Sequence, residues 1–342
     1  MKLIFQCIIW SIIGVIIYRQ KIVSANVSRL IAKALYWVGV PLQIFFLVRN
    51  SDFGQVVWLP PVVSVLVLLL GLGFTLVVIG LFEQLFFNNS LQTSTVNEQR
   101  NTLRLTELAP SNKAESHKAI IPTTDAEKGS FILGSILGST GFIGLSLVPS
   151  LVARDRWSWI VLYVVAHNIL GSYGLGALIA KHFSSNSSSN DWLDECLDRL
   201  QSLVLLPSLW AFACGYFSQN FTLPYTMELF ISKGTLLIIP GAFVLIGIQL
   251  SELGQWRNLR LGIVPAIVKI FVLPCVTGLL LTLSGFRGDS RLVLVLMSGM
   301  PTAFASIILA ETYNLERNIA ASSILLSVLS MPISLCLWLI LF

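Results

Sequence analysis

Two hydrophobic stretches of this chain decide its fold: GSILGSTGFIGLSLVPS (residues 134–150) and VLMSGMPTAFASIILAETY (residues 295–313). Both are rich in Gly, Ser, Thr and Pro, where a membrane helix is normally rich in Leu. Breaking a helix frees backbone N–H and C=O groups that lipid cannot satisfy, so broken helices persist only where they line a buried or water-filled site. A matched pair of them, one in each half of a chain, is typical of the binding site of a secondary transporter.

The composition is that of an integral membrane protein. Hydrophobic residues make up 55% of the chain and charged residues 11%, against roughly 25% charged residues in a soluble domain. The net charge of +5 comes from Lys and Arg in the loops, which gives no reason to expect nucleic acid as a partner. The five cysteines are scattered and lack CxxC spacing, so the sequence predicts no metal site and no cofactor.

A window of about 20 apolar residues per span predicts ten transmembrane helices, five in residues 1–183 and five in residues 197–342. Because each half holds an odd number of spans, the second half enters the membrane in the opposite sense. The predicted fold is therefore an all-α integral membrane protein built of two inverted five-helix repeats, with broken helices in spans 4 and 9. The predicted spans cover residues 3–18, 30–48, 62–82, 130–152, 157–181, 197–217, 229–250, 259–283, 292–313 and 319–341.

Two hydrophilic segments separate the predicted spans. Residues 83–129 are rich in polar residues and predict a disordered loop between spans 3 and 4, and residues 184–196 predict a linker between the repeats. Lys and Arg are more numerous on the side of the membrane that holds both segments. By the positive-inside rule both segments are expected to be cytoplasmic. We therefore expect a multi-pass protein of the plasma (inner) membrane with both termini on the non-cytoplasmic side.

The two interrupted spans supply most of the candidate substrate-binding residues. They place small side chains and flexible backbone near the middle of the bilayer, and the N-termini of half-helices there favour a carboxylate or another anion. The alternative is tight helix packing through small residues, which the spaced glycines of span 4 also allow. The candidates in these two spans are Ser139, Thr140, Gly141, Gly299, Pro301, Thr302 and Ser306.

Ionisable residues inside a span are functional candidates by default. Lys269 lies near the centre of span 8, where it either attracts an anionic substrate or tethers two helices. His167 and Asn168 lie in the middle of span 5, where the histidine either relays protons or packs as a satisfied neutral side chain. No Asp or Glu falls near the centre of a predicted span, so the coupling ion, H⁺ or Na⁺, stays open, and a facilitator gains weight.

Spans 2 and 7 each carry a mid-membrane proline followed by a glutamine. Gln43 comes after Pro41, and Gln249 comes after Pro240. These amides either bind a substrate from two sides or only form hydrogen bonds between helices. We include all four residues among the substrate-binding candidates.

Three motifs resemble the auxin efflux carrier family, which includes bacterial and fungal carriers and the plant PIN proteins. MPTAFASIILAETYNLERNIAASSILLSVLSMPISL (residues 300–335) is similar to the C-terminal pattern of that family. STGFIGLSL (residues 139–147) resembles its NTGxxGLPL signature, and VGVPLQIFF (residues 38–46) resembles its span 2 motif. The chain resembles a bacterial-type member in most of its length.

The resemblance implies a crossover of the broken spans 4 and 9, a scaffold with a mobile transport bundle, and outward-facing termini. It also implies organic anions as substrates, such as indole acetate in plants and malate in bacteria. The chain departs from the family at three positions. Ser139 stands where the family usually has Asn, Ser146 where it has Pro, and Ala305 where Asn is often found.

The leading hypothesis is a carrier, in the efflux direction, of a small organic anion such as an auxin-like or other carboxylate. It works by alternating access around the crossover. The expected partners are this anion and the lipid bilayer, and a homodimer is left open. The second hypothesis is a transport-inactive membrane sensor or scaffold on the same fold, which the two missing amides, at Ser139 and Ala305, favour. An intramembrane enzyme finds little support, because no span contains HExxH, paired aspartates or GxSxG.

Overall fold

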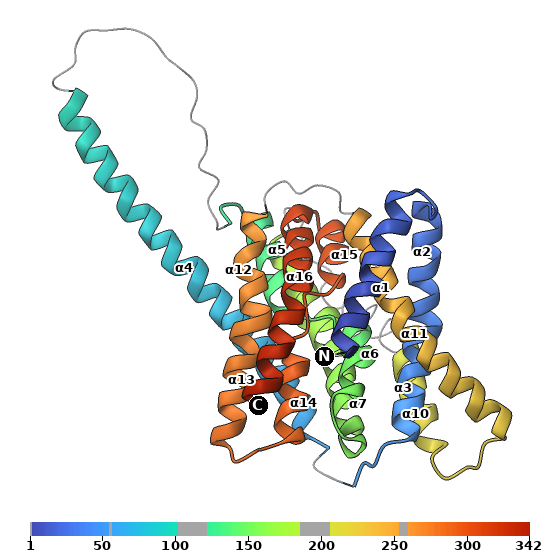
Figure 1. Ribbon diagram of the computed structural model, residues 1–342. Helices are drawn as coiled ribbons and strands as arrows, with labels where there is room; N and C mark the ends of the chain where they lie inside the picture. The colour runs from blue at the N-terminus through green and yellow to red at the C-terminus, as the bar shows by residue number, and fades with distance from the viewer. Residues whose placement is uncertain (1, 55–56, 102–121, 185–205, 253–258) are drawn as a thin grey trace, which may run out of the picture.

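The computed structural model describes residues 2–54, 57–101, 122–184, 206–252 and 259–342, and the regular structure of these residues is helical. The helices form a bundle with roughly parallel axes, and α4 projects from it at an angle (Figure 1). One isolated antiparallel bridge, between Gly138 and Thr302, interrupts the helical pattern in the described residues.

The first half of the chain contains helices that are repeatedly interrupted by π-helical turns (η1, η2 and η5) and 3₁₀ turns (η3 and η4). Its elements are α1 (Lys2–Arg19), α2 (Ala25–Ala34), η1 (Leu35–Gly39), α3 (Val40–Arg49), α4 (Leu59–Asn101), α5 (Asp125–Ile136), η2 (Thr140–Gly144), α6 (Leu145–Leu147), η3 (Val148–Ser150), η4 (Arg154–Arg156), α7 (Trp157–Ala166), η5 (His167–Gly176) and α8 (Ala177–His182).

The second half contains one further π-helical turn, η6, inside a long apolar helix. Its elements are α10 (Pro207–Phe217), α11 (Tyr225–Glu252), α12 (Arg260–Ile267), η6 (Val268–Val272), α13 (Leu273–Leu283), α14 (Asp289–Ser298), α15 (Ala305–Thr312) and α16 (Arg317–Leu341).

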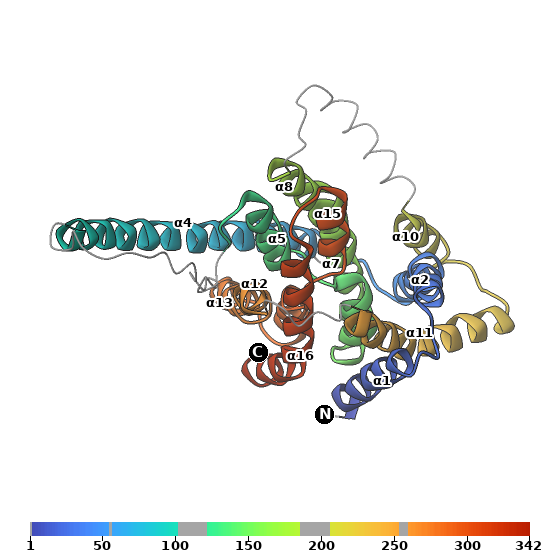
Figure 2. The same ribbon diagram turned by 90° about the horizontal axis from the view of Figure 1, so that it is seen from above.

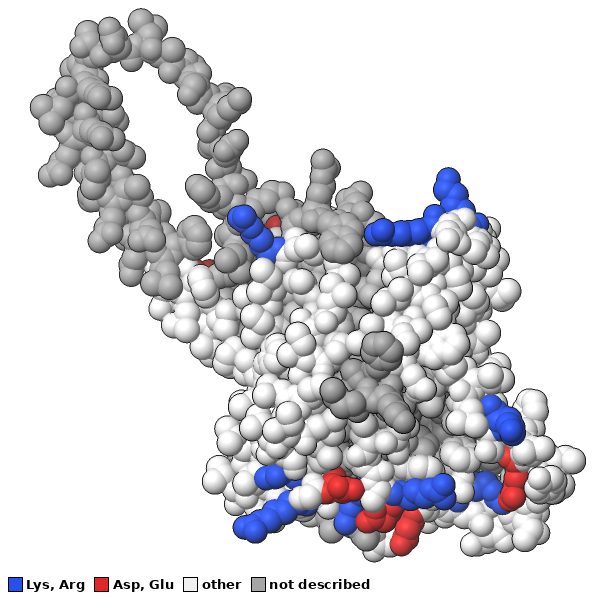
Figure 3. Space-filling view, viewed as in Figure 1, with Lys and Arg blue, Asp and Glu red and all other residues white. Residues whose placement is uncertain are grey.

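Six continuous helical stretches among the described residues are long and apolar enough to cross a membrane, so the chain is an integral membrane protein. The space-filling view agrees, because charged residues gather along two opposite edges with an uncharged band between them (Figure 3). The six stretches are Asn26–Arg49, Leu59–Gln84, Arg154–His182, Tyr225–Glu252, Arg260–Leu283 and Arg317–Leu341.

The two interruptions occur where the sequence predicts them. The helix of span 4 ends with α5 at Ile136 and resumes at Thr140, and the helix of span 9 ends with α14 at Ser298 and resumes with α15 at Ala305. Each break lies at the end of a buried helical segment, residues 129–136 in the first case and residues 293–298 in the second. The breaks therefore lie in the interior of the protein, where lipid does not reach them.

The segment between spans 3 and 4 differs from the expectation of a loop over residues 83–129. Helix α4 continues through Asn101, and α5 begins at Asp125, so helix occupies both ends of this segment. The start of α5 is fixed by a capping box, in which Thr124 Oγ1 accepts from the Glu127 N–H and Glu127 accepts from the Thr124 N–H. Most of the expected linker at residues 184–196 lies outside the described residues.

The helices separate into two groups when the bundle is viewed from above (Figure 2). One group, the peripheral group, consists of α1, α2, α3, α10 and α11, with α1 packed along α11 and α3 along α10. The other, the crossover group, contains both broken spans with α4, α7, α8, α12, α13 and α16. The two groups meet where α3 packs against α6 and α7 and where α11 packs against η2 and α6.

Close approach of α1 and α11 depends on glycine. A Cβ added at Gly247 would overlap the backbone carbonyl of Ser11, and one added at Gly14 would overlap the carbonyl of Val244. Two glycines facing each other in this way let the two backbones touch, as small residues do in many membrane helix pairs.

We therefore expect Gly247→Ala to lower the thermal unfolding midpoint of the detergent-solubilised protein, since overpacking of this kind costs roughly 1–3 kcal/mol. Gly73→Ala is the matched control, because a Cβ at position 73 of α4 has no heavy atom within 4 Å. Equal midpoints for the two variants would contradict the packing of α1 on α11.

Candidate functional site: a crossover of two broken helices

The backbones of the two breaks pair with each other. The Ser139 N–H donates to the Pro301 carbonyl at 2.7 Å, and the Ala303 N–H donates to the Leu137 carbonyl at 2.9 Å. This reciprocal exchange is the pattern of an antiparallel β pair. It satisfies backbone groups that the helix breaks have released, which is what an apolar surrounding demands.

Two buried side chains accept hydrogen bonds from the bridged residues, Gly138 and Thr302. The Gly138 N–H donates to His167 Nε2 at 3.1 Å, and the Thr302 N–H donates to Ser327 Oγ at 3.0 Å. The Thr302 hydroxyl in turn donates to the Gly134 carbonyl at 2.8 Å. Each break is thus anchored by the unbroken span that follows it in the chain.

His167 begins the π-helical turn η5 and is completely buried, with its ring stacked on Tyr163 at a centroid distance of 5.8 Å. Because Nε2 accepts from the Gly138 N–H, the neutral ring carries its proton on Nδ1. Nδ1 has no hydrogen-bond partner among the described residues. The histidine therefore acts as an anchor of the crossover through one nitrogen only.

Lys269 lies against both breaks. It belongs to the π-helical turn η6, it is completely buried, and its Nζ donates to the Ser298 carbonyl at 3.1 Å. A Cβ added at Gly138 would be 2.7 Å from Lys269 Cε and 2.9 Å from Nζ. A side chain at position 138 would therefore require the end of the Lys269 side chain to move.

The second half of broken span 4 presents a free hydroxyl. Thr140 begins the helical stretch Thr140–Ser150, is completely buried, and has no partner for Oγ1 among the described residues. Next to it, a Cβ at Gly141 would lie 3.2 Å from Asn168 Nδ2, so Asn168 lines the same region. Thr140 therefore offers a buried hydroxyl at this end of the crossover, with the Asn168 amide beside it.

Two other candidates in span 9 have structural contacts. A Cβ at Gly299 would be 3.1 Å from Pro274 Cγ, so this glycine allows close packing of the break on α13. The Ser306 hydroxyl donates to the Ala303 carbonyl at 2.7 Å and closes the first turn of α15.

The four candidates of spans 2 and 7 belong to the peripheral group. Gln43 is buried, and its Nε2 donates to Ser146 Oγ at 3.3 Å, which joins α3 to the second half of broken span 4. Gln43 Oε1 has no partner among the described residues. Pro41 opens α3, while Pro240 and Gln249 are partly buried on α11, which packs against η2 and α6.

The candidates drawn from the sequence do not include Ser327 or Tyr163. Ser327 lies in the hydroxyl-rich last span, a feature visible in the sequence, but several serines there share the same surroundings in the chain. Only the fold shows which of them reaches Thr302.

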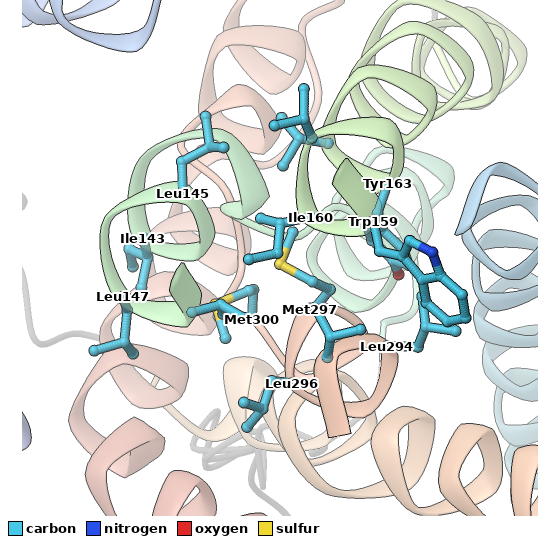
Figure 4. Packing of buried hydrophobic residues seen from close by; sticks show 14 of the residues in the cluster. Ile143, Leu145, Leu147, Trp159, Ile160, Tyr163, Leu294, Leu296, Met297 and Met300 are labelled. Atoms are coloured by element: carbon cyan, nitrogen blue, oxygen red, sulfur yellow. The ribbon is translucent and has the colours of Figure 1, made fainter. Parts of the chain in front are cut away.

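Apolar side chains seal the second half of broken span 4 (Figure 4). Ile143, Leu145 and Leu147 of that segment pack in one buried cluster with residues of α7 and α14. Met297 fits against Gly144, where an added Cβ would be 3.1 Å from the Met297 Cε. This packing surrounds the polar groups of the crossover with a low-dielectric environment.

Comparison with known proteins agrees with this architecture. Residues 220–339, which include η6, both halves of broken span 9 and most of α16, match the family described as "Membrane transport protein". This part of the chain is therefore similar to that family. The match confirms the resemblance carried by the C-terminal motif. The chain is also 23% identical over 226 residues to an uncharacterized transporter of Methanocaldococcus jannaschii, covering 65% of this chain and 70% of the relative.

The anchoring role of Ser327 is testable on its own helix. We expect Ser327→Ala to destabilise the protein by about 1–3 kcal/mol, because the buried Thr302 N–H loses its acceptor. The measurement is the unfolding midpoint of purified protein. Ser334→Ala is the control, since the buried Ser334 hydroxyl donates only to the Met331 carbonyl of the same helix. A loss for Ser334→Ala as large as that for Ser327→Ala would contradict the anchor.

Proposed function

We propose that the protein is a secondary carrier that exports a small organic anion by alternating access around the crossover. The observation that carries the proposal is the buried, unpartnered Thr140 hydroxyl at the start of a half-helix, beside a backbone crossover closed by Ser139 and Pro301. Two comparisons support the proposal: residues 220–339 match the membrane transport protein family, and a relative is named as a transporter.

The charge distribution of the crossover favours an anion. The helical stretch Thr140–Ser150 and helix α15 both start at the breaks, so their N-terminal ends direct partial positive charge toward the same region. Thr140 Oγ1 and Asn168 Nδ2 add donors that a carboxylate can accept from. The Gln43 amide, at the boundary with the peripheral group, adds a further polar contact for the remainder of the substrate.

Inverted repeats of five helices are the architecture that we propose for this carrier. The hydrogen bonds at the crossover support it, because each break donates to the other through the residue that follows its central position. The anchors support it too, since span 5 supplies His167 to the first break and span 10 supplies Ser327 to the second. Such reciprocity is what a two-fold axis in the membrane plane produces.

Alternating access is proposed to arise from motion of the crossover group against the peripheral group. The two groups are separate sets of helices in the view from above (Figure 2) and are joined by contacts such as Gln43 with Ser146. A substrate bound at Thr140 would lie close to this boundary. Its exposure to either side of the membrane then changes as the boundary shifts.

The orientation that we propose is the one expected from the positive-inside rule. The connections α1–α2 and α15–α16 lie at one end of the bundle, at the top of Figure 1, and Figure 3 shows Lys and Arg both at this end and at the opposite end of the visible face. The excess of Lys and Arg in the sequence is on the side of α1–α2 and α15–α16. This end would face the cytoplasm in the plasma membrane, with both chain termini directed to the other side.

A transport-inactive sensor or scaffold is the second candidate. Ser139 and Ala305 put a hydroxymethyl and a methyl group where related carriers often have amides, so the crossover has fewer side-chain donors for a carboxylate. Such a protein would bind an anion without moving it. Binding without counterflow in proteoliposomes would identify this alternative.

We expect Pro301→Ala or Gly141→Leu to abolish anion counterflow in proteoliposomes while the protein still inserts in the membrane. Pro301 keeps the break open by lacking an N–H donor, and a side chain at position 141 would strike Asn168. The measurement is uptake of labelled carboxylate by vesicles preloaded with the same anion. Normal counterflow in both variants would overturn the proposed site.

Thr140→Val tests the anion contact with little change in side-chain volume. We expect carboxylate binding to weaken roughly tenfold or more, as for loss of a hydrogen bond to a charged group, with an unchanged unfolding midpoint. Thr277→Val is the control, because Thr277 is also buried with an unpartnered hydroxyl but lies on α13 outside the crossover. Equal affinities of the two variants would exclude Thr140 as a ligand.

A further inference from the structure

Lys269 is the one completely buried lysine among the described residues, and its hydrogen-bond partner is a backbone carbonyl. It donates to the carbonyl of Ser298, the last residue of α14. It also lies beside Gly138, just beyond the end of α5 at Ile136. The ammonium therefore lies where the C-terminal ends of two half-helices converge.

C-terminal helix ends carry partial negative charge, and the carbonyls released at such ends are the groups that coordinate Na⁺ or H⁺ in carriers with broken helices. In this protein the Ser298 carbonyl is already paired with the Lys269 Nζ. No Asp or Glu among the described residues forms an ion pair with Lys269, and its hydrogen-bond acceptor is a backbone carbonyl. The N-terminal ends at Thr140 and Ala305 remain available for an anion.

We propose that the Lys269 ammonium is a built-in cation of the crossover, which takes the place of a coupling Na⁺ between the two half-helix C-termini. A tethered cation cannot dissociate, so the crossover is held together without a soluble monovalent ion. The transport step, which rests on the function proposed above, then requires no Na⁺ gradient.

The first test uses stability and needs no substrate. We expect the unfolding midpoint of the purified full-length protein to be the same in NaCl and in choline chloride at equal ionic strength. Lys269→Met, which keeps the length and removes the charge, should lower the midpoint by about 5 °C or more, because the buried Ser298 carbonyl loses its donor and the two half-helix C-termini lose their counter-charge. Lys233→Ala, which removes an exposed lysine of another span, should leave the midpoint unchanged.

The second test is chemical rescue. Lys269→Ala removes the side chain and opens space beside Gly138, so added Na⁺ or methylammonium should raise the midpoint of this variant and not that of Lys269→Met. Stabilisation of the wild-type protein by Na⁺ relative to choline would overturn the proposal. A Lys269→Met variant as stable as wild type, or a folded Lys269→Ala variant that neither cation stabilises, would overturn it equally.

Transport gives a separate result. Carboxylate counterflow by the wild-type protein should be equal in Na⁺ and choline media, and a requirement for Na⁺ would overturn the built-in cation. If no organic anion is moved in either medium, the proposed carrier function fails, while the midpoints still decide the role of Lys269. If neither variant folds, the role of Lys269 is still decided by comparing the unfolding midpoints of the wild-type protein in NaCl and in choline chloride.

Discussion

The pair of backbone hydrogen bonds between the two helix breaks is the interaction on which the rest of the structure depends. Ser139 with Pro301, and Ala303 with Leu137, satisfy groups that would otherwise be unpaired in the apolar interior. Each such group would cost several kcal/mol in hydrocarbon. Because each break supplies the partners of the other, neither interrupted helix is stable in the bundle without its counterpart.

This constraint explains the surroundings of the crossover. His167 and Ser327 accept hydrogen bonds from the Gly138 and Thr302 N–H groups, which the bridge itself does not pair. The apolar cluster of Figure 4 excludes water from the same region. Both His167 and Lys269 lie in π-helical turns, which rotate a side chain out of the regular helical register and often occur at functional sites. The polar groups are thus placed by local departures from the α-helix in spans that are otherwise ordinary.

The half-helix ends at the crossover carry partial charges of opposite sign at their N-terminal and C-terminal ends. The half-helix N-termini at Thr140 and Ala305 offer positive ends, while the C-termini at Ile136 and Ser298 offer negative ends. An anion and a cation can therefore be held near each other without any carboxylate side chain. Lys269 fills the cation position from within the chain, and the free Thr140 hydroxyl lies on the anion side.

The sequence by itself determined the membrane class and the two interruptions, and it singled out Lys269, His167 and Thr140 as candidates, because hydropathy, helix-breaking residues and rare polar groups within spans are visible along the chain. It predicted loop for residues 83–101, where α4 continues, since polar residues on a helix that leaves the bundle look like loop residues. Only the tertiary structure decided that the Thr302 N–H donates to Ser327 and that Lys269 donates to the Ser298 carbonyl of α14. These partners are far apart in the chain, and which of several equivalent serines or carbonyls is reached depends on how the helices pack, which local sequence does not encode.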